Sequence, residues 1–207
     1  VPMLRNSIAA ARASGARLLY PGTVYNFGPD AFPLLREGAA QRPLTRKGAV
    51  RAEMEAMLSD AADNGGVRST VLRAGDFFGP RAPSTWFAQA VVKPGRPVRK
   101  VTWPGRPGVG HAWAYLPDLA EAFARLADVE ADLPAFESLH FAGHWVEDGG
   151  AMAAAVREAA GDPALPLRRF PWTLLSLAAP FNAFLREMLE MRHLWEQPVR
   201  LDNTRLR

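Results

Sequence analysis

Two loops of the sequence carry polar side chains directly after runs of apolar residues. The first loop covers residues 21–29 and contains the hydroxyl groups of Thr23 and Tyr25. The second covers residues 74–81 and contains the carboxylate of Asp76. In an open α/β sheet, ligands bind beyond the carboxyl ends of the strands, where backbone groups converge and loops can vary. We therefore expect proton transfer to a substrate held between these two loops.

The segments around the loops predict a strand, a helix and a second strand. The runs over residues 16–20 and 67–73 are apolar, and the second is rich in β-branched residues. Between them, apolar residues recur at helical spacing over residues 46–63, with Thr45 as an N-cap and a glycine-rich end at residues 64–66. A helical crossover joins parallel strands, so we predict an α/β fold with a parallel sheet.

The rest of the chain predicts shorter elements. A helix is expected over residues 118–128, where Asp118 and Glu121 have the spacing of a capping box. A final helix would carry apolar side chains from Phe181 to Trp195 on one side. Such a stripe is typical of a core or of a partner surface.

The composition excludes several classes of protein. Of 207 residues, 48% are hydrophobic and 22% are charged, as in soluble globular domains. The absence of cysteine excludes a disulfide framework, a thiolate metal site and a cysteine nucleophile. No run approaches the roughly 20 apolar residues of a membrane span. We therefore expect a cytoplasmic protein without a membrane partner.

The net charge of +4 does not predict a nucleic-acid partner. The 25 Lys and Arg residues are scattered among 21 Asp and Glu residues and form no basic stripe. An anionic small substrate would suit this charge. His140 and His144 are four residues apart, but they lie at the end of an expected strand without other ligands nearby, so we expect no metal site.

Three motifs follow one another along residues 18–127. They are Thr23-Val24-Tyr25 followed by Gly28, the sequence Val-Leu-Arg-Ala-Gly-Asp-Phe-Phe-Gly-Pro at residues 71–80, and Trp-Ala-Tyr-Leu-Pro-Asp-Leu-Ala at residues 113–120. In order and spacing they resemble the NAD-dependent epimerase/dehydratase family, a group of extended or atypical short-chain dehydrogenases/reductases. The resemblance implies NAD or NADP as cofactor, a small-molecule substrate and, as in other members, a homodimer.

The resemblance also implies how the chain is organised. Residues 1–130 would form the C-terminal half of a Rossmann-like NAD(P)-binding domain with inserted substrate-region segments. Residues 131–207 would form a C-terminal α/β region that binds the substrate or caps the site. The expected fold class is therefore α/β, with an incomplete Rossmann-like doubly wound parallel sheet and a small, mostly helical C-terminal substrate-binding region.

One part of the family pattern is missing from the sequence. The family has a glycine-rich turn whose backbone amides meet the cofactor pyrophosphate. The most similar stretch of this sequence, residues 105–110, contains a proline, and no helix is expected directly after it. We therefore expect the nucleotide-binding half upstream of Val1, and an exposed sheet edge at residues 16–20 or 67–73 where its strands would pair.

The catalytic residues of the family are replaced here. The family uses a Ser or Thr after the strand, and a Tyr and a Lys four residues apart on the next helix. The resemblance places Pro21, Lys47 and Arg51 at these three positions. Lys47 would need a lowered pKa to act as an acid or base, whereas Arg51 could still donate to a ribose. The alternative is that both are ordinary solvated helix residues.

The residues of the two loops divide by expected role. Thr23 and Tyr25 are alternative hydroxyl donors, although Tyr25 has an equal alternative as a packing residue. Asp76 is expected to face the substrate, the alternative being a turn residue that bonds its own backbone. The candidates are Lys47, Tyr25 and Thr23 for catalysis; Pro21, Gly22, Arg51, Ala74, Gly75 and Phe77 for the cofactor; and Asp76, Phe78 and Arg81 for the substrate.

The resemblance implies hydride transfer between NAD(P) and a small substrate, such as a sugar nucleotide or a carbonyl compound, with a non-standard acid/base. The alternative function is a catalytically silent NAD(P)-binding sensor or scaffold of the same fold. The missing Ser-Tyr-Lys set favours the sensor, and the retained Asp76 loop favours the enzyme.

Overall fold

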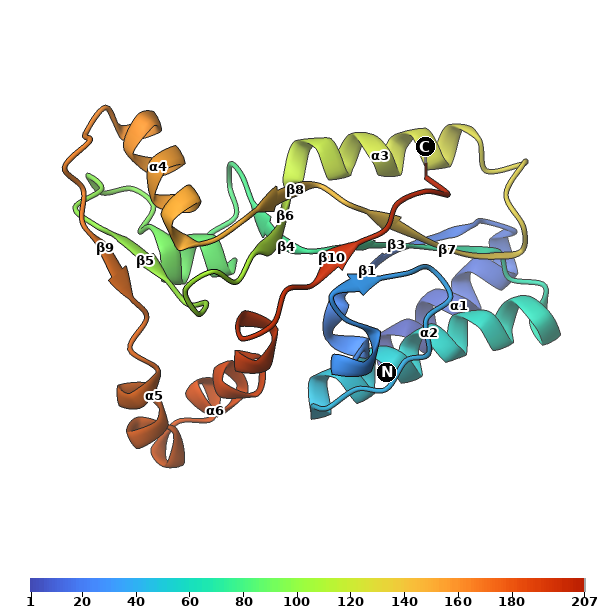
Figure 1. The fold of residues 1–207 in the computed structure, drawn as a ribbon. Helices are drawn as coiled ribbons and strands as arrows, with labels where there is room; N and C mark the ends of the chain where they lie inside the picture. Colours follow the sequence, from blue (N-terminus) through green and yellow to red (C-terminus); the bar gives the residue numbers. More distant parts are fainter. Residues whose placement is uncertain (207) are drawn as a thin grey trace.

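The structure is a computed structural model that describes residues 1–206, and it contains a parallel sheet that lies between two layers of helices (Figure 1). The strands β1 (Leu18–Gly22), β3 (Ser69–Ala74) and β7 (Phe136–Phe141) stand in the order β1-β3-β7. Every residue of β3 is buried, as expected for a strand covered on both faces. Within residues 1–206, β1 pairs with β3 alone, so one of the two predicted edges is found.

Helices cover both faces of this sheet. α1 (Pro2–Ser14) and α2 (Arg46–Gly65) pack on one face, and α3 (Leu116–Asp128) packs on the other (Figure 1). Consecutive strand residues point to opposite faces. Accordingly, Val71 joins the core formed with α1 and α2, and Leu72 joins the core formed with α3. These three layers confirm the predicted Rossmann-like α/β fold.

The unit β1-α2-β3 agrees with the strand, helix and strand predicted from the sequence. The two strands are parallel, with Leu18 opposite Ser69. At the start of α2, the Thr45 side chain accepts a hydrogen bond from the Gly48 amide at 3.0 Å. At its end, Gly66 has a φ of 63°, a left-handed conformation that favours glycine.

The capping box predicted for α3 is wrong. The helix begins at Leu116, before Asp118, and Tyr115 precedes it without a side-chain cap. Pro117 lies in the first turn, where its fixed φ suits the helix and its missing N–H needs no partner. The proline therefore supplies the start signal that the sequence analysis assigned to the carboxylates.

A second, smaller region is formed by segments that come before and after β7 in the chain. Its elements are β4 (Asp76–Phe78), β5 (Val101–Trp103), β6 (His111–Tyr115), β8 (His144–Val146), α4 (Gly149–Ala160) and β9 (Leu167–Arg169). β6 pairs in parallel with β4 and in antiparallel with β8, while β5 pairs in parallel with β9. Its core is a cluster of aromatic rings around Trp103, Trp113 and Trp195, against which α4 packs.

The C-terminal segment runs from this region back toward the main sheet (Figure 1). α5 (Trp172–Ala178) and α6 (Ala183–Glu190) pack against each other. β10 (Arg200–Leu201) then pairs in parallel with β2 (Leu34–Leu35), which lies in the segment between β1 and α2. Among residues 1–206, no helix combines the length and the apolar character that a membrane crossing requires.

The continuous helix predicted over residues 181–195 is wrong. Asn182 caps α6 by accepting hydrogen bonds from two backbone amides, so the chain changes direction there. As a result Phe181 is 91% exposed, whereas Leu194 and Trp195 are buried after α6 has ended. The apolar residues therefore belong to different surfaces and do not form one stripe.

Candidate active site

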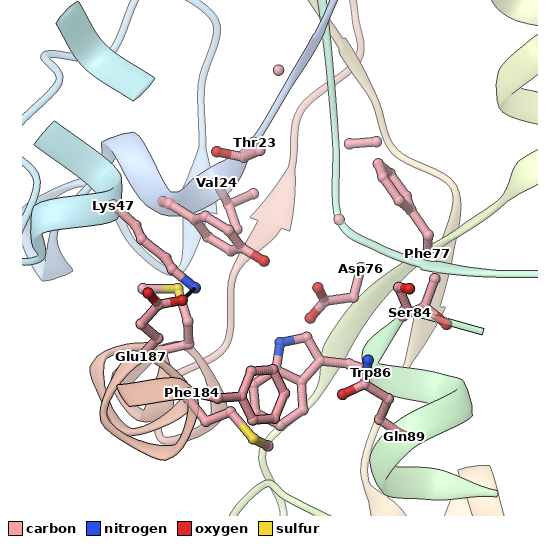
Figure 2. Close-up of a pocket in the computed structure, with 17 residues that line it drawn as sticks. Thr23, Val24, Lys47, Asp76, Phe77, Ser84, Trp86, Gln89, Phe184 and Glu187 are labelled. Atoms are coloured by element: carbon pink, nitrogen blue, oxygen red, sulfur yellow. Dashed lines mark ion pairs between the residues drawn. The ribbon is translucent and has the colours of Figure 1, made fainter. Parts of the chain in front are cut away.

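A cavity of about 250 Å³ lies at the carboxyl ends of β1 and β3, where the two predicted loops meet (Figure 2). The loops form one wall, and α6 with the segment between β4 and β5 forms the other. The lining residues are Gly22, Thr23, Val24 and Tyr25 after β1; Ala74, Gly75, Asp76 and Phe77 after β3; Lys47 of α2; Ser84, Thr85, Trp86 and Gln89; and Phe184, Glu187, Met188 and Met191.

Two of the three predicted catalytic residues are already bound by neighbours. Thr23 Oγ1 donates a hydrogen bond to Asn26 Oδ1 at 3.2 Å. Lys47 Nζ forms an ion pair with Glu187 Oε2 at 2.8 Å, and its side chain remains 43% exposed (Figure 2). The hydrogen bond from Lys47, together with its charge, lowers the pKa of Glu187. The pair thus joins α2 to α6 across the mouth of the cavity.

The third predicted residue, Tyr25, lies in the cavity wall with its hydroxyl group uncharged. Burial raises the pKa of this phenol well above its usual range, and the negative charge of Asp76 raises it further, while Arg51 acts in the opposite direction. The phenol therefore keeps its proton at neutral pH. It suits a hydrogen-bond donor to a ligand oxygen and does not suit a base.

Asp76, at the start of β4, presents its carboxylate to the cavity. Its Oδ2 lies 2.7 Å from Nε2 of His111. The side chains are 16% and 9% exposed, respectively. Figure 2 shows the carboxylate directed into the cavity above the ring of Trp86. The site therefore combines a half-buried acceptor, Asp76, with a half-buried donor, Tyr25.

His111 is a site residue that the sequence analysis missed. β4 and β6 pair so that Asp76 lies opposite Trp113. His111 is two residues before Trp113 and therefore points to the same face of the sheet. Its ring stacks on Trp195 with a centroid distance of 3.8 Å and an interplanar angle of 2°. The sequence showed only a histidine two residues from Trp113 in an expected strand. That pattern indicates a site residue only when the register of β4 on β6 is known.

A buried hydrogen-bond network fixes the loop after β1. Arg73, at the end of β3, binds Glu55 of α2 through two contacts of 2.9 and 2.6 Å and donates to the Thr23 carbonyl. Gln41 donates to Glu55 at 2.7 Å and accepts from Asn26 at 2.9 Å. The Thr23 hydroxyl, which donates to Asn26, closes the ring. The cavity wall is thereby tied to both α2 and β3.

Four of the predicted residues lie outside the cavity lining. Pro21 is exposed at the end of β1. Arg51 donates to the Tyr20 hydroxyl at 2.7 Å. Phe78 packs into the aromatic core of the second region, and Arg81 is exposed with a φ of 57°. The predicted cofactor and substrate residues that do line the cavity are Gly22, Ala74, Gly75, Phe77 and Asp76.

The two histidines spaced four residues apart do not share a site. His140 is buried in β7, with Arg73 of β3 opposite it. His144 is exposed, and its Nε2 lies 3.8 Å from an oxygen of Asp118. Within residues 1–206, no group of three or more His, Cys, Asp or Glu side chains is placed to hold a metal ion.

Comparison with known proteins identifies one matching family. The model of the NAD dependent epimerase/dehydratase family matches residues 2–138, which is more than half of the chain. The matched residues include the loops after β1 and β3, whereas α6 lies beyond them. No curated protein matches the sequence.

Several solved structures are similar in fold. A UDP-galactose 4-epimerase has 19% identity and a TM-score of 0.69 over 98% of this chain and 59% of that one. A UDP-glucose 4-epimerase of Thermus thermophilus, in complex with NAD, has 26% identity and a TM-score of 0.58 over 80% and 55%. A monomeric L-threonine 3-dehydrogenase from a metagenome has 15% identity and a TM-score of 0.72 over 99% and 62%. This chain spans less than two thirds of each.

Proposed function

The chain belongs to the NAD-dependent epimerase/dehydratase family, and we propose on that premise that its cavity serves NAD(P)-dependent oxidoreductase or epimerase chemistry. The observation that carries the proposal is the cavity at the ends of β1 and β3, where the phenol of Tyr25 and the carboxylate of Asp76 face the same space. A donor and an acceptor at one carbinol or carbonyl oxygen are what hydride transfer at the neighbouring carbon requires.

The residues present fit the nicotinamide end of NAD or NADP. A cavity of about 250 Å³ is small for a whole dinucleotide but large enough for one ring and a small substrate. Of the residues that the sequence predicted for the cofactor, the backbone of Gly22, Ala74 and Gly75 and the ring of Phe77 would hold the nicotinamide. When bound, the nicotinamide supplies the hydride chemistry. Among similar structures, the Thermus epimerase is described as a complex with NAD.

The remaining lining would orient the substrate and exclude water. Tyr25 would donate its phenolic hydrogen to the reacting oxygen. Phe184 and Met188 supply an apolar wall, and the pair of Lys47 and Glu187 holds α6 over the cavity. Sugar nucleotides and small carbonyl compounds remain the proposed substrate class, since the similar structures include UDP-sugar epimerases and a threonine dehydrogenase.

A second candidate is a catalytically silent NAD(P)-binding sensor or scaffold. It is favoured by the residues that stand at the family's three catalytic positions, because two of them are bound to neighbouring side chains and the third has no hydroxyl group. Lys47 is paired with Glu187, Arg51 is bound to Tyr20, and Pro21 lacks a hydroxyl group. This candidate predicts cofactor binding without turnover.

Turnover separates the two candidates. The full-length protein would be supplied with NAD or NADP and a panel of sugar nucleotides, alcohols and carbonyl compounds, and the absorbance of reduced nicotinamide would be followed. We expect Tyr25→Phe to lower kcat about 10- to 100-fold, because one donor to the reacting oxygen is lost. Tyr115→Phe, on a tyrosine outside the cavity lining, is the matched control and should not change kcat. Cofactor binding with no turnover would favour the sensor.

A further inference from the structure

We propose that Asp76 and His111 form the proton-accepting pair of this site, with Asp76 as the catalytic base and His111 as the positioning residue. The proposal rests on the proposed function. It assigns the role of base, which the family's catalytic residues would fill and which their replacements here do not. The two side chains come from neighbouring strands of the β4-β6-β8 sheet, and their contact of 2.7 Å joins Asp76 Oδ2 to His111 Nε2.

The position of the pair fits a base that acts from the cavity wall. Asp76 lines the cavity, whereas His111 lies behind it and is not part of the lining. The carboxylate therefore has one oxygen bound from behind and the other available to a ligand. A hydrogen bond to a carboxylate oxygen fixes its rotamer, which a base must have before the substrate arrives.

The aromatic core holds the His111 ring in place. One face of the ring is stacked on Trp195 at 3.8 Å, and Trp103 approaches at 6.3 Å with an interplanar angle of 87°. The ring has little freedom to rotate away from Asp76, because large side chains pack against it on more than one side. The second region thus positions a group on the cavity wall without reaching into the cavity itself.

A buried pair of this kind is often only structural, and the same molecule provides the comparison. In the pair of Arg73 and Glu55, both carboxylate oxygens are engaged, Oε1 by Arg73 and Oε2 by Arg73 and Gln41. For Asp76, the described chain engages Oδ2 alone. A saturated carboxylate fixes a loop, whereas a carboxylate with one open oxygen beside a cavity is suited to receive a proton.

The proton step balances within the proposed reaction. The O–H bond of a substrate alcohol breaks, and its proton passes to Asp76 Oδ1 while Oδ2 keeps its contact with His111. When bound, the oxidised nicotinamide would supply the acceptor for the hydride of the adjacent carbon, so the products would be a carbonyl compound, reduced cofactor and a protonated Asp76. In the opposite direction Asp76 returns the proton, and Tyr25 donates a hydrogen bond to the same oxygen in both directions.

Steady-state kinetics of matched variants of the full-length protein test the roles. Asp76→Asn keeps the shape and removes the base, and we expect kcat to fall at least about 100-fold with KM changed less than about threefold. His111→Phe keeps the stacking on Trp195 and should lower kcat about 10-fold or more, with partial recovery in His111→Gln, whose amide can donate. The controls are His144→Phe and Asp118→Asn, an exposed His and Asp at 3.8 Å, which should leave kcat unchanged.

Nitrogen NMR of the histidine rings supplies a readout that does not depend on activity. The protein has four histidines, so the His111 resonances are assigned by their loss in His111→Phe. We expect Asp76→Asn to shift the His111 Nε2 resonance and to leave that of His144 in place. An unshifted resonance, or a kcat that survives Asp76→Asn, would overturn the pair as the base. Absence of turnover in the wild type would overturn the proposed function, and the base with it.

Discussion

The polar side chains that line the cavity differ in whether other side chains of the protein already hold them by hydrogen bonds or ion pairs. Thr23 is bonded within the network around Glu55, and Lys47 is paired with Glu187. Tyr25 keeps its proton, and Asp76 keeps one carboxylate oxygen open toward the cavity. Residue type alone could predict that these groups meet after the strands. It could not predict which of them are saturated, because their partners lie up to 140 residues away in the chain.

The same limit explains the residue that was missed. His111 acquires its role from the register of β4 on β6 and from a stack on Trp195, 84 residues later in the sequence. Neither contact leaves a local pattern. Conversely, Arg51 was predicted from a spacing of four residues, but its length allows it to reach Tyr20 instead of the cavity.

His140 should make the protein less stable at acidic pH. Burial, followed by the positive charge of Arg73, lowers the pKa of His140 to about 4, against an ordinary value of 6.5, while Asp202 acts in the opposite direction. Between these values the unfolded state binds more protons than the folded state. The contribution of neutral His140 to the free energy of unfolding is therefore fully present above about pH 6.5. It is lost as the pH falls toward 4 and amounts to roughly 3 kcal/mol.

Urea unfolding at several pH values between 7.5 and 4 measures this dependence. We expect His140→Gln to flatten it, because the titrating group is gone. His144→Gln, which changes an exposed histidine, is the control and should keep the wild-type slope. The same slope in His140→Gln as in the wild type would assign the pH dependence to other groups.

Among the helices and strands, the sequence predicted those whose ends and faces are set by residues close together in the chain. The helix between Thr45 and Gly66 and the two strands around it follow from caps and apolar spacing. The single helix over residues 181–195 failed because a helical spacing of apolar residues continued across a turn capped by Asn182. Periodicity cannot distinguish one face of a helix from the faces of two consecutive short helices.

The link between α2 and β3 should depend on the buried pair of Arg73 and Glu55. Their side chains are 1% and 3% exposed, so removing one partner leaves a charge without compensation. We expect Arg73→Met to lower the free energy of unfolding by about 3–5 kcal/mol. Because Arg73 also donates to the Thr23 carbonyl, the loop after β1 should loosen in this variant.

Chemical denaturation of a double variant isolates the charge effect. Arg73→Met combined with Glu55→Met removes both charges and should recover most of the stability lost in Arg73→Met. Arg125→Met is the matched control, because it breaks an exposed pair with Glu121 and should cost less than about 1 kcal/mol. A double variant less stable than Arg73→Met would mean that the pair acts through packing instead of charge.

At the level of the whole molecule, the cavity lies between two units with different construction. A three-layer parallel sheet supplies the loops after β1 and β3, and a region with an aromatic core supplies His111 behind Asp76. The family resemblance predicted the first unit and its loops. The pairing of the strands in the second unit could not be predicted from spacing, since these strands are only three to five residues long and pair across long connections.

The central claim is that the cavity receives the nicotinamide ring of NAD or NADP, and tryptophan-to-nicotinamide energy transfer measures this most directly. Trp86 lines the cavity, so its emission should excite a reduced nicotinamide bound there. We predict a saturable rise of nicotinamide emission when the full-length protein is titrated with NADH or NADPH, and a smaller rise in Trp86→Phe at equal occupancy. No saturable signal with either cofactor would contradict the account.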